Sequence, residues 1–197
     1  QFIKALLNNE KGLHIDKDHF MTISPDEGSM NRAIYLANVL GVDMGMYYKR
    51  LDYSRYVNGR HPIAAYEFLG PKIEGKDMIL IDDMISSGDT IIKIASLLKE
   101  KGAGRVYICS TFGFFTDGLD KFDDAYKKGY FDKLLTTNLV YQSPELLEKP
   151  YYISCDMSKY IALIIDTLNH DNSVSHLLNP ADRIKRCVTN YMSQHEK

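Results

Sequence analysis

Apolar positions along the chain fall into two patterns, short continuous runs and helical stripes, which alternate. The continuous runs are typical of buried strands and lie at His19–Ser24, Met44–Lys49, Met78–Asp83 and Arg105–Thr111, with shorter ones near Lys133–Thr136 and Tyr151–Ser154. Between them, apolar residues recur at the three- and four-residue spacing of a helix. Strands that alternate with helices form parallel sheets covered on both faces. The pattern therefore predicts one α/β domain, a parallel twisted sheet flanked by helices.

Turn and charge signals bound the predicted helices. One helix begins near Met30 and stops at Gly41, and another begins near Ile91 and ends before Gly102. The acidic-then-basic segment 117–128 predicts a third, because its charges complement the helix dipole. Amphipathic helices follow at 157–168, as core or as a subunit contact, and from residue 181. The polar, tyrosine-rich segment 50–62 predicts a long loop, and loops of that length in compact domains are usually functional or disordered.

The beginning of the chain is predicted to form a segment separate from the main domain. Residues 1–17 predict a leading helix, with Phe2, Ile3, Leu6 and Leu7 on its apolar side, and a linker into a domain at 18–197. The first residue is Gln1 rather than methionine. We therefore expect a piece of a longer protein.

Composition and charge exclude several classes of function. The 197 residues carry 24 Lys and Arg against 26 Asp and Glu, a net charge of −2, which gives no electrostatic footprint for nucleic acid. No apolar run approaches the roughly 20 residues of a membrane span. Cys109, Cys155 and Cys187 show neither disulfide nor zinc spacing, which favours a reducing compartment, the cytoplasm. We expect no nucleic-acid partner and no membrane partner.

The most informative segment, 79–90, joins a predicted buried strand to a predicted helix. The strand ends in Asp82 and Asp83, and the residues that lead into the helix are Ser86, Ser87, Gly88, Asp89 and Thr90. Ligands bind at the carboxyl ends of strands in open α/β sheets, and a helix N-terminus offers N–H groups and a positive dipole end to a phosphate. Taken alone, the acid pair could simply cap a helix. With the whole segment, the pattern favours a sugar-phosphate site, its carboxylates binding vicinal hydroxyls directly or through Mg²⁺.

This segment resembles the phosphoribosyl-diphosphate signature of type I phosphoribosyltransferase folds. Further segments, in the same order, resemble the ribose-phosphate diphosphokinases (phosphoribosyl-diphosphate synthetases): Ser24-Pro25-Asp26-Glu27-Gly28-Ser29, Tyr48-Lys49-Arg50, 102–107 and 172–175. The similarity covers about residues 18–178 and corresponds to the carboxyl-terminal half of that enzyme. The resemblance implies a type I phosphoribosyltransferase-like fold. It also implies transfer of diphosphate from ATP to the 1-hydroxyl of ribose 5-phosphate, for nucleotide biosynthesis.

The resemblance further implies a role for each matching residue. Asp82 and Asp83 would hold the ribose hydroxyls, and residues 86–90 would bind the 5-phosphate. The turn Asp26, Glu27, Gly28 and Ser29 would face the diphosphate, with Asp26 contacting the cofactor Mg²⁺. Lys49 would be the catalytic lysine that neutralises charge on the transferred group. The implied partners are the substrates ribose 5-phosphate and ATP, the amino-terminal half of the same enzyme, and further copies in a homo-oligomer.

Three positions depart from the family pattern. Leu51 occupies the place of an arginine two residues after Lys49, and Arg50, next to it on an extended segment, points to the other face. Phe112-Gly113 replaces a His-Gly or His-Pro pair, and Asp89 places an acid inside the phosphate loop, where its side chain must turn away. Two alternatives stay open. One is a nucleobase phosphoribosyltransferase, which needs no ATP; the other is a non-catalytic synthetase-associated regulatory module, which the loss of the arginine favours.

Overall fold

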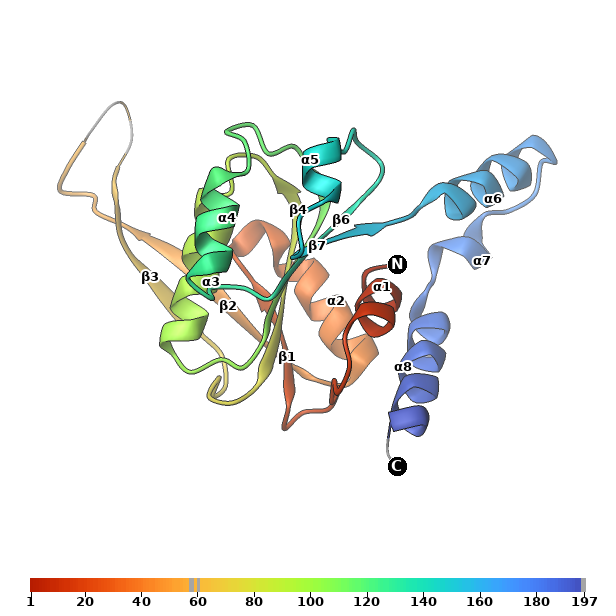
Figure 1. Ribbon diagram of the computed structural model, residues 1–197, viewed down its shortest axis with the longest axis horizontal. Coiled ribbons are helices and arrows are strands. Elements are labelled where there is room, and N and C mark those ends of the chain that lie inside the picture. The colour runs from red at the N-terminus through yellow and green to blue at the C-terminus, as the bar shows by residue number, and fades with distance from the viewer. Residues whose placement is uncertain (57–58, 60, 196–197) are drawn as a thin grey trace.

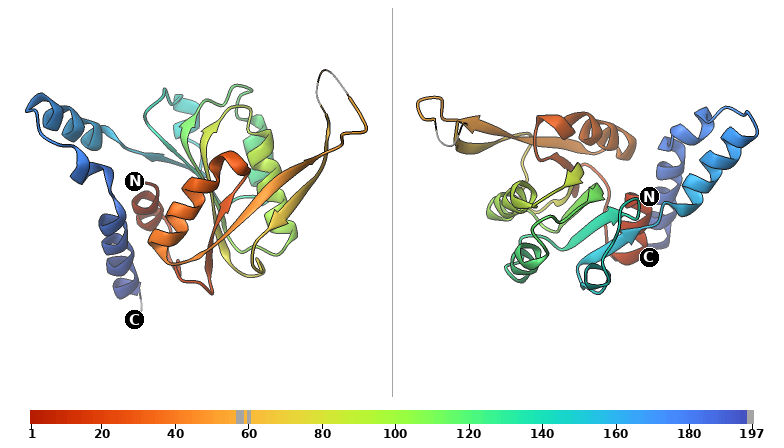
Figure 2. Two further views of the ribbon diagram at one scale, coloured as in Figure 1. Left: turned by 180° about the vertical axis from the view of Figure 1, so that it is seen from behind. Right: turned by 90° about the horizontal axis from the view of Figure 1, so that it is seen from above.

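The computed structural model describes residues 1–56, 59 and 61–195, and in this part a seven-stranded sheet carries helices on both faces (Figures 1 and 2). The strand order is β3-β2-β1-β4-β5-β6-β7. The strands are β1 (Phe20–Ser24), β2 (Asp43–Leu51), β3 (Ile63–Leu69), β4 (Asp77–Ile85), β5 (Val106–Gly113), β6 (Lys133–Thr137) and β7 (Tyr152–Cys155). All neighbouring pairs are parallel except β2 and β3. The predicted fold class is confirmed.

The antiparallel edge strand β3 corrects the prediction of a purely parallel sheet. Its residues are exposed or half-buried, so the strand lacks the continuous buried run by which the others are predicted. Its cross-strand partner β2 extends through Leu51, so the predicted loop 50–62 is shorter than expected. Of that loop, residues 57, 58 and 60 lie outside the described residues.

The helices confirm most of the predicted bounds. The short 3-10 turn η1 (Glu27–Ser29) leads into α2, which ends at Gly41 with a φ of 72°, a left-handed conformation that favours glycine. The acidic-then-basic helix begins later than predicted, at Asp120. The helices are α1 (Phe2–Asn9), α2 (Met30–Leu40), α3 (Asp89–Glu100), α4 (Asp120–Lys127), α5 (Pro144–Leu147), α6 (Ser158–Asn169), α7 (Ser175–Leu178) and α8 (Ala181–His195).

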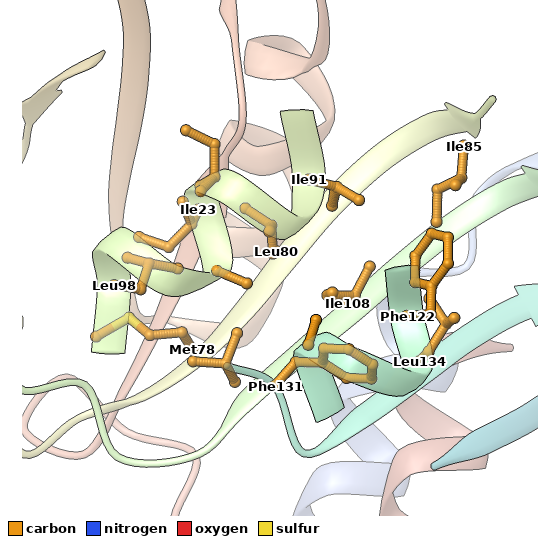
Figure 3. Close-up of a cluster of buried hydrophobic side chains, with 14 of the residues drawn as sticks. Ile23, Met78, Leu80, Ile85, Ile91, Leu98, Ile108, Phe122, Phe131 and Leu134 are labelled. Carbon is orange, nitrogen blue, oxygen red and sulfur yellow. The ribbon is translucent and has the colours of Figure 1, made fainter. Parts of the chain in front are cut away.

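Two hydrophobic cores cover the two faces of the sheet. On one face α3, α4 and α5 pack through residues such as Leu98 and Phe122, both fully buried (Figure 3). On the other face α1, α2 and α8 enclose a second cluster that includes Leu6, Ala33 and Tyr191. Because apolar side chains cover both faces, the central strands read as continuous apolar runs.

The leading helix predicted from residues 1–17 forms as α1, and it packs against α8. Its apolar side, Ile3, Leu6 and Leu7, is buried. The Tyr191 hydroxyl of α8 donates to the Glu10 carbonyl at 2.9 Å and accepts from the Leu13 N–H at 3.2 Å. The division of the chain at residue 18 stays a prediction.

Helix α6 projects from the body of the molecule (Figure 1), and none of its residues is buried. The helix is amphipathic as predicted, but the interpretation of its apolar side as core is wrong, since Ile165 is 62% and Leu168 58% exposed. Among the described residues, no helix has the length and apolar character needed to cross a bilayer.

The strand order places a ligand crevice at one point of the sheet. From β1 the chain continues to β2 on one side of the sheet, whereas from β4 it continues through β5 and β6 to β7 on the other side. The direction in which successive strands are added therefore reverses between β1 and β4. Crevices of open α/β sheets form at the carboxyl ends of the strands at such a reversal. The segments that follow β1 and β4 are Pro25–Ser29 and Ser86–Thr90, the two turns that the sequence singles out.

Candidate functional site

Two adjoining hollows lie at the carboxyl ends of β1, β2 and β4. The larger, about 340 Å³, is lined by Asp26, Gly28, Ser29 and the segment 82–91. The smaller, about 310 Å³, is lined by Asp26, Glu27, Gly28, Lys49 and Leu51. The hollows share Asp26 and Gly28, and every residue predicted for the site lines at least one of them. The structure therefore brings together residues from three separate segments of the chain.

The acid pair at the end of β4 is bound to the elements beside it. The half-buried Asp82 accepts hydrogen bonds from the Ser29 hydroxyl at 2.5 Å and from the Asp83 N–H at 2.9 Å. The exposed Asp83 is paired with Arg32 of α2, at 3.1 Å between Oδ2 and Nη2. Sequence reasoning missed Arg32, although its place one helical turn after Gly28 puts it on the side of α2 that faces the turn. The two carboxylates are thus positioned before any ligand binds.

Burial is the main influence on the charge of Asp82. It raises the pKa of this carboxyl above its ordinary value, because a carboxylate loses hydration when it is buried. Hydrogen bonds from Ser29 and the Asp83 N–H lower the pKa, while the neighbouring charge of Asp26 raises it. The net rise means that the ionised form of Asp82 is less stable in the folded protein than in the unfolded chain.

The substitution Asp82→Asn should therefore stabilise the protein near neutral pH. The pKa of an Asp carboxyl in the unfolded chain is about 3.9. A carboxyl whose pKa is higher than this in the folded protein lowers the free energy of unfolding as the pH rises from the unfolded pKa through the folded pKa. We expect Asp82→Asn and the wild type to unfold at similar temperatures near pH 3, and the variant to unfold at a higher temperature by about pH 7. Thermal unfolding without added metal measures this difference. A variant that is less stable than the wild type at both pH values would contradict the assignment.

The segment predicted to bind phosphate, residues 86–90 (below, the phosphate loop), turns sharply from β4 into α3. Gly88 has a φ of 84°, and α3 begins at Asp89. The Ser87 hydroxyl donates to Asp89 Oδ2 at 2.9 Å. The first N–H groups of a helix have no partner within the helix and carry its positive dipole end. The loop therefore presents an anion-binding surface directly beside the acid pair.

The segment after β5 supports this loop from behind. The Phe114 N–H donates to the Ile85 carbonyl at 2.9 Å, and the Thr116 N–H donates to the Ser86 carbonyl at 3.1 Å. The ring of Phe122 packs under Gly88 so closely that a Cβ there would lie 2.3 Å from the ring. Sequence reasoning missed this support. No local pattern indicates it, because the contacts join segments that are separated in the sequence by helix α3 and strand β5.

The turn after β1 carries Asp26 toward Lys49. Asp26 Oδ1 accepts from the Gly28 N–H at 3.0 Å, and its Oδ2 lies 3.9 Å from Lys49 Nζ. Arg50 points to the other side of the hairpin, where its Nε lies 2.6 Å from Glu67 Oε1. Leu51 lines the smaller hollow together with Lys49, whereas Arg50 is not among its lining residues, as expected if Arg50 points to the other face of the extended segment.

The donor set of the cleft fits a magnesium ion shared with a ligand. Mg²⁺ prefers hard oxygen ligands, commonly one or two carboxylates together with substrate phosphates and water. Asp26 and Asp82 are both among the residues that line the larger hollow. In the part of the chain that the structure describes, no group of three or more His, Cys, Asp or Glu residues is placed to hold a metal. The residues therefore fit an ion that phosphate oxygens help to bind, rather than a cage made by protein alone.

Comparison with known proteins identifies the family of the chain. A family model described as the phosphoribosyl synthetase-associated domain matches residues 60–179. The ribose-phosphate pyrophosphokinase of Vibrio parahaemolyticus is 29% identical over 82% of this chain and 49% of its own. That of Vibrio cholerae is 29% identical over 89% of this chain and 52% of its own. The chain thus spans about half the length of the curated relatives it matches.

One solved structure supports the fold independently. The phosphoribosylpyrophosphate synthetase from Mycobacterium smegmatis superposes with a TM-score of 0.64, covering 78% of this chain and 46% of that chain. At 23% sequence identity, this likeness bears on the fold alone.

Proposed function

Because the chain belongs to the phosphoribosyl synthetase-associated domain family, we propose that it is the carboxyl-terminal, ribose 5-phosphate-binding half of a ribose-phosphate diphosphokinase. One observation carries this proposal: the acid pair, the phosphate loop and Lys49 line two adjoining hollows at the reversal point of the sheet. A phosphate site beside two carboxylates suits a ligand with a phosphate at one end and vicinal hydroxyls at the other.

Two groups of residues, the phosphate loop and the acid pair, bind the two ends of ribose 5-phosphate. The 5-phosphate accepts hydrogen bonds from N–H groups of the phosphate loop and is attracted by the N-terminus of α3. The ribose hydroxyls donate to Asp82 and Asp83, and hydrogen bonds to charged groups are among the stronger ones in proteins. The bonds that Asp82 receives from Ser29 and the Asp83 N–H hold it in place, so little order is lost when the sugar binds.

In the proposed reaction, the 1-hydroxyl oxygen of the sugar attacks the β-phosphorus of ATP. The new oxygen–phosphorus bond forms as the bond to the AMP oxygen breaks, and the hydroxyl proton is released. Such a transfer needs positioning and cations more than covalent help from protein. Lys49 supplies one positive charge at the margin of the site. Asp26 would hold Mg²⁺ together with the substrate phosphates, and the bound ion would supply further positive charge near the oxygens that gain negative charge.

The remaining parts of the proposal concern partners and location. ATP, the amino-terminal half of the same enzyme and other copies in a homo-oligomer are the partners we infer from the relatives, whose length is about twice the matched segment. Cys109, Cys155 and Cys187 are free thiols, which supports a reducing compartment such as the cytoplasm.

A second candidate is a non-catalytic module that binds the sugar phosphate and regulates a synthetase. The position of Leu51 beside Lys49 in the smaller hollow favours it, because a leucine there supplies no charge to a transferred diphosphate. Both candidates predict binding of ribose 5-phosphate, but only the first predicts formation of phosphoribosyl diphosphate and AMP from ATP.

Calorimetric titration of the chain with ribose 5-phosphate tests the site common to both candidates. We expect saturable binding of ribose 5-phosphate and no measurable binding of ribose at the same concentrations, since ribose lacks the group that the phosphate loop binds. Equal affinity for the two sugars would contradict the proposed phosphate loop.

A further inference from the structure

Lys121 belongs to α4 and does not line the cleft, yet it is bonded to the phosphate loop. Its Nζ lies 2.8 Å from Asp89 Oδ1 and 2.9 Å from Asp117 Oδ2. The other carboxylate oxygen of Asp89 accepts from the Ser87 hydroxyl. Both oxygens of the acid inside the loop are therefore engaged, one by the loop itself and one by a cation from a different helix.

An acid in this place creates an electrostatic conflict with the ligand. A phosphate monoester carries about −1.5 to −2 charges near pH 7, and a carboxylate in the same loop repels it. Protonation does not relieve the conflict, because hydrogen bonds from Lys121 and Ser87 lower the pKa of Asp89. The loop therefore needs a positive charge close to Asp89 in order to bind an anion.

The contribution of Lys121 to folding is expected to be small. Its side chain is 42% exposed and that of Asp89 is 67% exposed, and ion pairs between exposed groups stabilise proteins little. The location of Lys121 is nevertheless well defined, because the next residue, Phe122, is fully buried under Gly88. Packing of α4 against the loop thus places a cation beside the one acid that the loop contains.

We infer that Lys121 is a positioning residue for phosphate binding: it neutralises Asp89 and holds that carboxylate on the α4 side of the loop. This inference rests on the proposed function, since it requires a phosphate at the loop. Lys121 then acts on the ligand through Asp89 rather than by contact. Together, Asp89 and Lys121 leave this part of the loop without net charge, as an uncharged residue at position 89 would do alone.

Substitution of both members of the pair tests the inference. We expect Lys121→Met to weaken ribose 5-phosphate binding about tenfold at low ionic strength, where charge effects are least screened. Asp89→Asn should bind ribose 5-phosphate more tightly than the wild type, because the substitution removes the carboxylate that repels the phosphate and keeps the backbone N–H groups of the loop. The double variant Asp89→Asn/Lys121→Met should return to within about threefold of the wild type, since the charge and its neutraliser are removed together.

Lys127→Met is the matched control, because Lys127 lies at the far end of α4 and its nearest ion pair, with Asp124, is 3.9 Å long and exposed. Calorimetric affinity for ribose 5-phosphate is measured for all five proteins, and circular dichroism verifies that each is folded. If Lys121→Met binds within twofold of the wild type, or if Asp89→Asn does not rescue it, the inference is wrong while the proposed function stands. If the folded wild type binds no ribose 5-phosphate, the proposed function fails and the inference fails with it.

Discussion

Replacement of Lys49 by alanine should reduce ATP-dependent formation of phosphoribosyl diphosphate about 100-fold or more in the intact enzyme that we propose contains this chain. Removal of one preorganised group that stabilises developing charge typically costs about 10²–10³ in rate. Lys49 is held only loosely, with its Nζ 3.9 Å from Asp26 Oδ2, so its charge is available to a ligand. Steady-state assays of product formation measure the effect.

The neighbouring cation provides the control for this substitution. Arg50 lies on the opposite side of the strand, bonded to Glu67, so Arg50→Ala should change the rate by less than about threefold. Ribose 5-phosphate affinity should be unchanged in Lys49→Ala, because Lys49 lines only the smaller hollow. A loss of less than about tenfold, or about 1.4 kcal/mol, would argue against a catalytic lysine and in favour of the non-catalytic module.

Replacement of Gly88 by alanine should lower the free energy of unfolding by about 2–5 kcal/mol. The left-handed backbone of Gly88, with a φ of 84°, costs a residue with a Cβ about 1–2 kcal/mol. The added methyl group also meets the Phe122 ring at 2.3 Å, and overpacking of this kind costs about 1–3 kcal/mol. Because the ring is fully buried, it cannot move away easily. Denaturant unfolding measures the loss.

Gly41→Ala separates these two contributions. Gly41 also has a left-handed φ, 72°, but a Cβ there would meet no atom within 4 Å. This variant should therefore lose only the backbone contribution, about 1–2 kcal/mol. If Gly88→Ala is no more destabilising than Gly41→Ala, the packing of α4 against the phosphate loop is not as tight as described.

The sequence was sufficient to predict the parts of the fold that depend on local pattern. Strands β1 and β4 read as continuous apolar runs because both of their faces are buried, and α2 has a clear end at Gly41. Strand β3 was missed because it lies at the edge of the sheet, where exposed and half-buried residues leave no continuous apolar run. The amphipathic pattern of α6 predicted a helix but not its surroundings, since an apolar stripe does not specify what covers it.

The site shows the same division between local and long-range information. The acid pair and the phosphate loop are contiguous in sequence, and the resemblance identified both. The ion pair between Arg32 and Asp83 joins residues 51 positions apart, and that between Lys121 and Asp89 joins residues 32 apart. Such contacts depend on how helices pack against the sheet, and a single sequence carries no signal for them. The acid at position 89 was recognised as a departure, but its partner became visible only in three dimensions.

Calorimetric titration of the wild type and of Asp82→Asn/Asp83→Asn with ribose 5-phosphate, with and without Mg²⁺, tests the central claim most directly. Each carboxylate bonded to a ribose hydroxyl contributes about 1.5–3 kcal/mol, so the account predicts saturable binding by the wild type and at least about 100-fold weaker binding by the variant. Asp82→Asn is expected to be more stable than the wild type near neutral pH, so unfolding would not explain weaker binding by the double variant. Thermal unfolding of the double variant verifies this directly. Equal binding by both proteins, or no binding by the folded wild type, would contradict a ribose 5-phosphate site at the end of β4.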